Sequence, residues 1–380
     1  MSHQIRAEAS ARCFPRWKIM TGIRVVQWAT GNIGSRSLRH IIQHPGLTLA
    51  GVYVTSAAKA GRDAGELCGL PATGVTATGD IAEILALGAD CVLYMPADCD
   101  LEQVCAILAA GANIVTTRGE FLHPGSMSPA DRERVEQACA EGGASIHGTG
   151  SSPGFISEAI PLVLTSIQRR LDALTINEYA DVSSRDSPDM LFDLMGFGHP
   201  AHEFPPERFA YGAYSFGPSM RLVAEAVGLP IDSVTSTGEV AVTPEKLTIA
   251  AGTLDAGTVA GLRMIVTGTR AGRALMTFTA TWYCTANLEP AWTVRGNGWH
   301  ILVEGDAPLD IDVRFACPVE QMAEMTPGYT ANRAVNAVPY VCAAAPGIRT
   351  TVDLPQIIPA LGGQVRLAGP SAGEHLFDER

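Results

Sequence analysis

Between residues 23 and 148, short apolar segments alternate with helical patterns, and this alternation restricts the fold more than any other feature. We predict strands over IRVVQW, LTLAGVYV, DCVLYM, NIVTT and ASIHG, with a further short strand considered at VTAT. Most of the segments between them carry the apolar spacing of helices. Strands joined through helices predict a doubly wound parallel sheet with right-handed crossovers, which binds ligands at the carboxyl ends of its strands.

The first predicted strand runs directly into ATGNIG, residues 29–34, and then into a helix. This is the pattern G-x-G-x-x-G with alanine at the first position. The second position lets the backbone approach a pyrophosphate, the third lets the helix pack closely on the strand, and the helix N-terminus supplies amides. Glycines at such a turn can have a purely steric origin, but their place at the start of a βαβ unit favours a Rossmann domain that binds a dinucleotide. The predicted cofactor contacts are Thr30, Gly31, Asn32, Ile33 and Gly34.

The loop after the second predicted strand bears on which dinucleotide is bound. A site selective for NAD usually places Asp or Glu here on the ribose 2′-hydroxyl, whereas this loop carries Thr55, Ser56, Lys59 and Arg62. Such donors suit a 2′-phosphate. An ordinary polar surface loop is the alternative. We therefore predict NADP as the cofactor, with NAD as a second one.

After about residue 155 the pattern changes to that of a second domain, as the length of 380 residues leads one to expect. Residues 231–316 consist mostly of alternating β segments with glycine turns, and residues 328–345 return to a helical pattern. The prediction is an α/β protein whose second, α+β domain is built on a largely antiparallel sheet. The predicted divisions are a disordered extension (1–22), the Rossmann domain (23–155), a substrate and dimerisation domain (156–327), a helix returning to the Rossmann domain (328–350) and a tail (351–380).

Composition excludes several classes of protein. The formal net charge is −12 and no long basic run occurs, which argues against binding to nucleic acid or anionic membranes. No apolar stretch approaches the length of a membrane span. The nine cysteines contain no C-x-x-C pair, so neither a disulfide framework nor a structural zinc site is predicted, and a cytoplasmic location fits. No metal site is predicted. The basic first twenty residues could form a transit peptide, but a disordered extension is preferred.

Several segments together resemble the dihydrodipicolinate reductase-like oxidoreductases. They are VVQWATGNIGSRSLR, SAAKAGRDAGEL, VTTRGEFLHP and GTGSSPGF. The similarity is greatest to the branch of NAD(P)-dependent amine dehydrogenases related to 2,4-diaminopentanoate dehydrogenase, which DVSSRDSPDMLFDLMGFG and ANRAVNAVPYVCAAAPGI also resemble. The resemblance covers about residues 23–350. The paired-histidine segment and the lysine-containing SGT segment of true dihydrodipicolinate reductases are absent, so that particular activity is not predicted.

The resemblance implies a two-domain homodimer that interconverts amines with ketones or aldehydes, with ammonia as nitrogen donor. It also implies that Glu120, just beyond the fifth strand, is the catalytic residue. A carboxylate can deprotonate the incoming ammonium ion and then stabilise the cationic iminium. By residue type alone, a glutamate in a loop is more often solvated.

The remaining candidates lie at strand ends and at the domain junction. We expect Tyr94, Met95, Pro96, Gly150 and Asn336 to contact the cofactor, and Ser152, Pro153, Phe155 and Phe197 to line the substrate pocket. A plain strand end and a plain hinge are the alternatives for the first three residues and for GTGSSPGF. Since these segments offer no fixed cation, we predict ketones and aldehydes without a carboxylate as substrates. The prediction would be wrong if Arg118 or Arg185 faced the pocket and bound a substrate carboxylate.

Two other functions remain open from the sequence. The same scaffold could carry an imine or carbonyl reductase, in which Glu120 merely orients the substrate. It could also be a dinucleotide-binding protein without catalysis, because a fold does not dictate a function.

Overall fold

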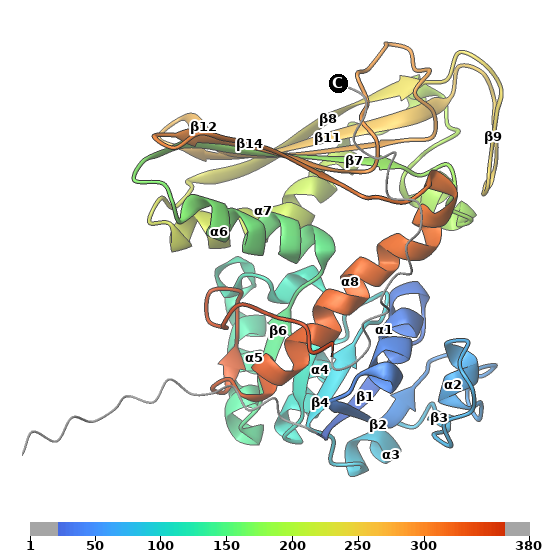
Figure 1. Cartoon of the computed structure of the whole chain (residues 1–380), viewed down its shortest axis with the longest axis vertical. Helices are drawn as coiled ribbons and strands as arrows, with labels where there is room; N and C mark the ends of the chain where they lie inside the picture. Colours follow the sequence, from blue (N-terminus) through green and yellow to red (C-terminus); the bar gives the residue numbers. More distant parts are fainter. Residues whose placement is uncertain (1–21, 362–380) are drawn as a thin grey trace, which may run out of the picture.

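A seven-stranded parallel sheet forms the first domain of the computed structural model, which describes residues 22–361 (Figure 1). The strand order is β15-β6-β5-β4-β1-β2-β3, the doubly wound order expected from the sequence. The strands are β1 (Ile23–Trp28), β2 (Leu47–Tyr53), β3 (Ala77–Thr78), β4 (Cys91–Tyr94), β5 (Asn113–Thr116), β6 (Ser145–Gly148) and β15 (Gly347–Ile348). The helices between them are α1 (Asn32–Gln43), α2 (Ala64–Leu67), α3 (Ile81–Ala86), α4 (Leu101–Ala109) and α5 (Pro129–Gly142).

The central strands are apolar on both faces because both faces are covered. On β1, Val26 and Trp28 pack into the core beneath α4 and α5, while Val25 packs with Ala334 and Val338 of helix α8 (Val319–Cys342). Burial on both sides explains why these strands are nearly continuous apolar runs. It also leaves only the carboxyl ends of the strands and the loops that follow them for ligands.

A six-stranded sheet of order β14-β13-β7-β12-β11-β8 forms the second domain. Only the β7–β12 pair is parallel. The strands are β7 (Leu171–Asp181), β8 (Ser233–Val242), β11 (Val259–Arg270), β12 (Arg273–Tyr283), β13 (Gly298–Gly305) and β14 (Leu309–Arg314), beside a small pair, β9 (Leu247–Ile249) and β10 (Gly252–Leu254). The predicted fold class is therefore confirmed.

Two helices lie between this sheet and the first domain, α6 (Ile160–Thr165) and α7 (Ala210–Ala226) (Figure 1). On α7, Phe216 stacks on Phe278 of β12 with ring centroids 4.0 Å apart. The sequence did not predict α7, because Gly212, Gly217 and Pro218 are poor helix formers. The helix is stabilised by burial against the sheet, which outweighs its weak intrinsic propensity.

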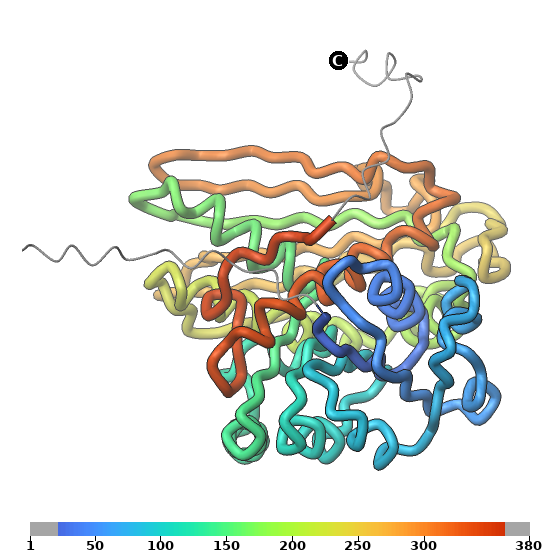
Figure 2. The backbone as a smooth tube through the Cα atoms, turned by 60° about the horizontal axis from the view of Figure 1, so that its bottom comes forward, coloured from blue at the N-terminus to red at the C-terminus, as the bar shows by residue number. Residues whose placement is uncertain are grey.

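Helix α8 connects the two domains. It begins at Val319, earlier than the predicted residue 328, and crosses to the first domain, where it lies beside α1 (Figures 1 and 2). The chain then adds β15 to the parallel sheet, and Leu354 and Ile357 are buried with β1 and α8. The predicted tail is therefore packed on the first domain as far as Ile357. The predicted extension lies outside the described residues except for Gly22, as does the tail beyond residue 361.

Two surveys of the described residues bear on membrane and metal binding. None of the helices in residues 22–361 combines the length and the apolar character needed to cross a bilayer. Within the same residues, no group of three or more His, Cys, Asp or Glu side chains is arranged to hold a metal ion.

Candidate active site

The turn between β1 and α1 has the shape that dinucleotide binding requires. Ala29 adopts a φ of +69°, the left-handed conformation that the first glycine of the pattern usually supplies. A Cβ atom at Gly34 would overlap the carbonyl oxygen of Ala29, so the last position requires glycine. The buried Gln27 side chain donates a hydrogen bond of 2.8 Å to that same carbonyl. Gln27, which the sequence analysis did not single out, thus holds the turn in place.

The N-terminus of α1 is open to an anion. Gly31 is its N-cap, no side chain caps the first turn, and a Cβ at Gly31 would meet nothing within 4 Å. The side chain of Asn32 accepts a hydrogen bond from Arg36, and Ile33 is half-buried. Free first-turn amides together with the helix dipole make this a ready site for a phosphate group.

The loop after β2 brings one cation to this turn. Lys59 donates a hydrogen bond of 2.8 Å from Nζ to the carbonyl oxygen of Thr30. Thr55 and Ser56 are exposed beside it. Arg62 lies 3.6 Å from Glu66 on the surface, one turn further along. Of the predicted 2′-phosphate ligands, Lys59 is therefore the one directly tied to the phosphate-binding turn.

Tyr94 at the end of β4 is a core residue. Its ring packs against Trp28 with centroids 5.8 Å apart, and its hydroxyl accepts a hydrogen bond of 3.0 Å from the backbone N–H of Asp100. Burial raises the pKa of Tyr94 to about 12. The side chain of Tyr94 thus belongs to the core, and a cofactor contact of Tyr94, Met95 and Pro96 through their backbone stays a prediction.

Glu120 lies in a short 3-10 helix (Gly119–Phe121) directly after β5. Arg118 donates two hydrogen bonds to its carboxylate, from Nη2 to Oε1 at 2.5 Å and from Nε to Oε2 at 3.3 Å. The hydroxyl of Tyr214 on α7 donates a third hydrogen bond, 3.1 Å long, to Oε1. Burial alone would raise the pKa of Glu120, but these hydrogen bonds outweigh it and hold that pKa below its ordinary value. The carboxylate is therefore ionised at neutral pH.

The segment after β6 forms the junction between the domains. Gly150 is extended and buried, and the helical turns from Ser151 to Ala159 are interrupted at Ser152, Pro153 and Gly154. Phe155 follows, with its ring centroid 6.2 Å from that of Trp299 on β13.

The fourth predicted pocket residue lies apart from any open surface. The side chain of Phe197 is only 1% exposed and belongs to the hydrophobic core of the second domain. Its burial is accounted for by packing in this core, and a role in the substrate pocket stays a prediction.

Several orphaned polar atoms, meaning buried atoms without a hydrogen-bond partner, lie near the β1–α1 turn and the domain junction. Among the described residues, five atoms on the β1–α1 turn, the junction after β6 and helix α8 are buried without a hydrogen-bond partner: Thr30 Oγ1, Thr149 Oγ1, Ser152 Oγ, Arg333 Nε and Asn336 Oδ1. Buried polar groups are nearly always paired in folded proteins. A bound dinucleotide would supply such partners, so the residues present fit this cofactor.

Strand β7 contributes a carboxylate that the sequence analysis missed. Glu178 accepts hydrogen bonds from the indole N–H groups of Trp282, at 3.1 Å, and Trp299, at 2.8 Å. Burial lowers the pKa of Arg185, and the charge of Glu178 opposes that shift, so the two groups interact electrostatically. Trp299 lies directly opposite Glu178 in the pairing of β13 with β7. The sequence could have suggested this contact only if that strand pairing had been known.

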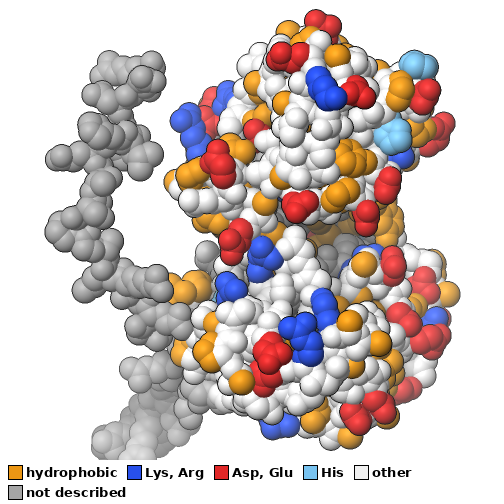
Figure 3. Space-filling model, turned by 90° about the vertical axis from the view of Figure 1, so that its right-hand side faces the viewer, with side chains coloured by type: hydrophobic (Ala, Val, Ile, Leu, Met, Phe, Trp, Pro, Cys, Tyr) orange, Lys and Arg blue, Asp and Glu red, His pale blue; other side chains and the backbone are white. Residues whose placement is uncertain are grey.

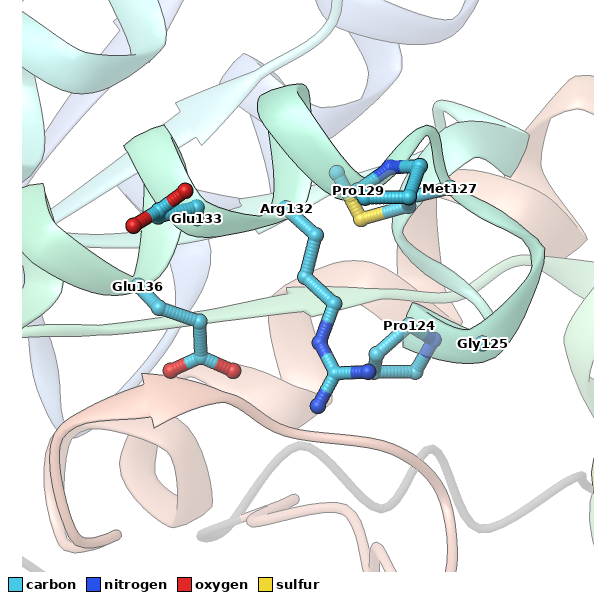
Figure 4. Close-up of a pocket in the computed structure, with 7 residues that line it drawn as sticks. All are labelled: Pro124, Gly125, Met127, Pro129, Arg132, Glu133 and Glu136. Carbon is cyan, nitrogen blue, oxygen red and sulfur yellow. The ribbon is translucent and has the colours of Figure 1, made fainter.

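The surface is hollowed between the two domains on the face shown in Figure 3. A separate depression of about 320 Å³ lies along α5 and the turn before it (Figure 4). It is lined by Pro124, Gly125, Met127, Pro129, Arg132, Glu133 and Glu136, none of which was predicted as a site residue. None of the predicted site residues therefore lines this depression.

The sequence of this chain matches known proteins over nearly its whole length. A model of the 2,4-diaminopentanoate dehydrogenase C-terminal domain matches residues 155–368, more than half of the chain. The chain belongs to the 2,4-diaminopentanoate dehydrogenase family. An amine dehydrogenase from Streptomyces virginiae is 29% identical over 353 residues, which cover 90% of this chain and 98% of that protein. The 2,4-diaminopentanoate dehydrogenase of Acetoanaerobium sticklandii is 23% identical over 248 residues, 64% of this chain and 66% of that protein.

A solved structure agrees on the fold. The amine dehydrogenase from Mycobacterium smegmatis superposes with a TM-score of 0.72 at 24% identity and covers 89% of this chain and 97% of its own. The predicted family and the prediction of an oxidoreductase are therefore confirmed.

Proposed function

We propose that this chain is an NAD(P)H-dependent amine dehydrogenase that reversibly converts small ketones or aldehydes and ammonia into amines. One observation carries the proposal. An ionised, half-buried carboxylate, Glu120, lies at the carboxyl edge of a dinucleotide-binding sheet, in a family whose named members act on amines. Reductive amination needs such a group, because both the incoming ammonium ion and the iminium that accepts hydride are cations.

The cofactor supplies the hydride when it is bound. The first-turn amides of α1 would hold its pyrophosphate, and the orphaned polar atoms of Thr149, Ser152 and Asn336 would pair with the rest of it. We assign NADP rather than NAD as the preferred form. The support is Lys59 at the phosphate-binding turn together with Thr55 and Ser56 beside it, where an acidic residue would select NAD.

Glu120 acts as the general base and general acid for the nitrogen substrate. It takes one from ammonium, so that free ammonia can add to the carbonyl carbon, and returns it as the carbinolamine loses its hydroxyl group as water. The carboxylate, ionised again, then faces the positive iminium and stabilises it while hydride reaches the carbon. In the reverse direction the same carboxylate receives the proton that water loses on attacking the iminium.

Of the arginines near the site, Arg118 is already engaged by the carboxylate of Glu120. Burial lowers the pKa of Arg185 and of Arg333, and the charges of Glu178 and Glu158 oppose the two shifts. Arg333 lies over the ring of Phe155, so Arg185 and Arg333 are the cations that could bind a substrate carboxylate. The wall around Phe155 and Trp299 is aromatic. We therefore assign neutral ketones and aldehydes, and the corresponding amines, as substrates rather than keto acids and amino acids.

We further propose a homodimer. The face of the six-stranded sheet opposite α6 and α7 carries a row of hydroxyl side chains on neighbouring strands, Thr175, Thr267 and Thr277 among them. No helix of residues 22–361 covers that face (Figure 1). Light scattering on the purified full-length chain tests the assembly, and a monomer at micromolar concentration would contradict it. The cytoplasmic location stays a prediction.

A carbonyl panel with both cofactors tests the activity. Oxidation of NADPH that requires both a ketone and ammonia supports the amine dehydrogenase. Oxidation with a ketone alone, or with a preformed imine but not ammonia, would favour the reductase. Cofactor binding without turnover across the panel would leave a non-catalytic dinucleotide-binding protein.

A further inference from the structure

The side chain of Tyr214 crosses from the second domain to the carboxylate of Glu120 in the first. Tyr214 lies on α7, 94 residues away in the sequence, and its hydroxyl donates to Oε1 at 3.1 Å. We propose that Tyr214 is a positioning residue of the amination reaction, which orients the catalytic carboxylate and helps to keep it ionised. The inference rests on the proposed function of Glu120.

The donors around the carboxylate are distributed unevenly. Among the side chains of residues 22–361, Arg118 Nη2 and Tyr214 donate hydrogen bonds to Oε1, while Oε2 accepts the longer bond from Arg118 Nε. Each carboxylate oxygen can accept two hydrogen bonds, so Oε2 keeps the larger free capacity. Arg118 is itself anchored on the carbonyl oxygen of Ala97. Arg118 and Tyr214 together therefore fix the plane of the carboxylate and leave Oε2 as the oxygen that exchanges protons with nitrogen.

Tyr214 is suited to this role and not to a role in the core. It is 56% exposed, so its ring contributes little to packing. Partial burial and the neighbouring Glu120 raise the pKa of its hydroxyl, which therefore stays protonated and acts as the donor. The titratable groups that face the carboxylate are Arg118 from its own segment, Cys99 from the loop before α4 and Tyr214 from α7. Among residues 22–361, Tyr214 is the group that the second domain supplies.

Replacing Tyr214 by phenylalanine removes the hydroxyl and keeps the ring. Tyr211 is a matched control: it lies on the same helix, is 59% exposed, and makes no hydrogen bond to Glu120 within residues 22–361. The measurements are kcat and kcat/KM for ammonia-dependent NADPH oxidation as a function of pH, with thermal melting and cofactor affinity as checks. They use the full-length chain.

For Tyr214→Phe we expect kcat to fall roughly 5- to 50-fold, since one hydrogen bond to a charged group is lost. The acidic limb of the kcat/KM profile should move to higher pH, because a carboxylate with one donor fewer holds its proton more tightly. Tyr211→Phe should behave like the wild type. In a Glu120→Gln background, Tyr214→Phe should cost no further activity.

Two results would overturn the inference while the proposed function stands. One is an unchanged kcat and pH profile in Tyr214→Phe beside a strongly impaired Glu120→Gln. The other is a lower kcat with the acidic limb unmoved, which would indicate a loss of packing alone. Near-normal turnover in Glu120→Gln would instead remove the catalytic role of Glu120, and with it the basis for the inference.

Discussion

The ammonium group of Lys59 donates a hydrogen bond of 2.8 Å to the carbonyl oxygen of Thr30, which ties the loop after β2 to the turn that opens α1. A loop held in this way keeps a cation beside the phosphate-binding amides, and Thr55 and Ser56 stand where an NAD-selective site usually has an acidic residue. The contact underlies the assignment of NADP.

The first prediction concerns cofactor preference. NADP(H) should bind at least as tightly as NAD(H), since charge-assisted hydrogen bonds to a phosphate contribute about 1.5–3 kcal/mol each before desolvation. Lys59→Ala should raise the dissociation constant of NADPH by roughly tenfold or more. Lys246→Ala is the matched control, because Lys246 is an exposed lysine of the second domain that pairs with Asp255. Titration by fluorescence or calorimetry gives these constants, and a strong NADH preference untouched by Lys59→Ala would show the assignment to be wrong.

The second prediction concerns Glu120. The change to glutamine keeps the shape and can still accept hydrogen bonds from Arg118 and Tyr214, but it removes the base and the negative charge. Amination should fall by roughly 10²–10⁴-fold, the usual contribution of a positioned acid–base group. The dissociation constant of NADPH should barely change. Steady-state kinetics of the purified variant decide it, and activity within a few-fold of wild type would return Glu120 to the role of a solvated loop residue.

The third prediction concerns the substrate. A simple ketone should have a higher kcat/KM than the keto acid of the same carbon skeleton, because Arg118 is bound to Glu120 and the wall around Phe155 and Trp299 is aromatic. A carboxylate buried without a free partner costs several kcal/mol, about a hundredfold or more in specificity. Side-by-side kinetics with ammonia and NADPH measure the ratio. A clear preference for the keto acid would mean that Arg118, Arg185 or Arg333 binds the carboxylate of the substrate.

The fourth prediction concerns stability and pH. Glu158 is fully buried at the domain junction, where Ser219 of α7 donates to it at 2.6 Å and Thr351 donates to its other oxygen. Burial raises its pKa from 4.5 to about 7, against the opposing effect of the two hydrogen bonds and of Arg333. The folded state thus holds this proton more tightly than the unfolded chain. The resulting stabilisation is fully present below pH 4.5 and is lost as the pH rises through about 7.

A glutamine at this position stays neutral at every pH. Glu158→Gln should therefore leave the melting temperature nearly unchanged at pH 5 and raise it relative to wild type at pH 9, by an amount equivalent to about 3 kcal/mol at most. Glu207→Gln, which replaces an exposed carboxylate, serves as the control. It should change the melting temperature by the same amount at pH 5 and at pH 9. If the melting temperatures of Glu158→Gln and wild type differed by the same amount at pH 5 and at pH 9, that result would contradict the raised pKa of Glu158.

The sequence by itself determined the parts of the fold that depend on local periodicity. Apolar runs and helical spacing over residues 23–148, and alternation over 231–316, are properties of neighbouring residues, and they predicted most strands of both sheets. The turn at Gly31 and Gly34 could be recognised for the same reason, because its glycines meet a requirement of the local backbone. Glu120 was found through a resemblance of its surrounding segment to a known family and not through its chemistry.

Tertiary structure alone decided how the candidate site is arranged. Helix α7 forms only because it is buried against the sheet, so the contact of Tyr214 with Glu120 could not be anticipated from either segment. Glu178 and Trp299 are 121 residues apart, and Glu158 and Thr351 are 193 apart. Side chains so distant in the chain meet through strand register and domain packing, and it is those contacts, absent from any local pattern, that set the charge and orientation of each carboxylate.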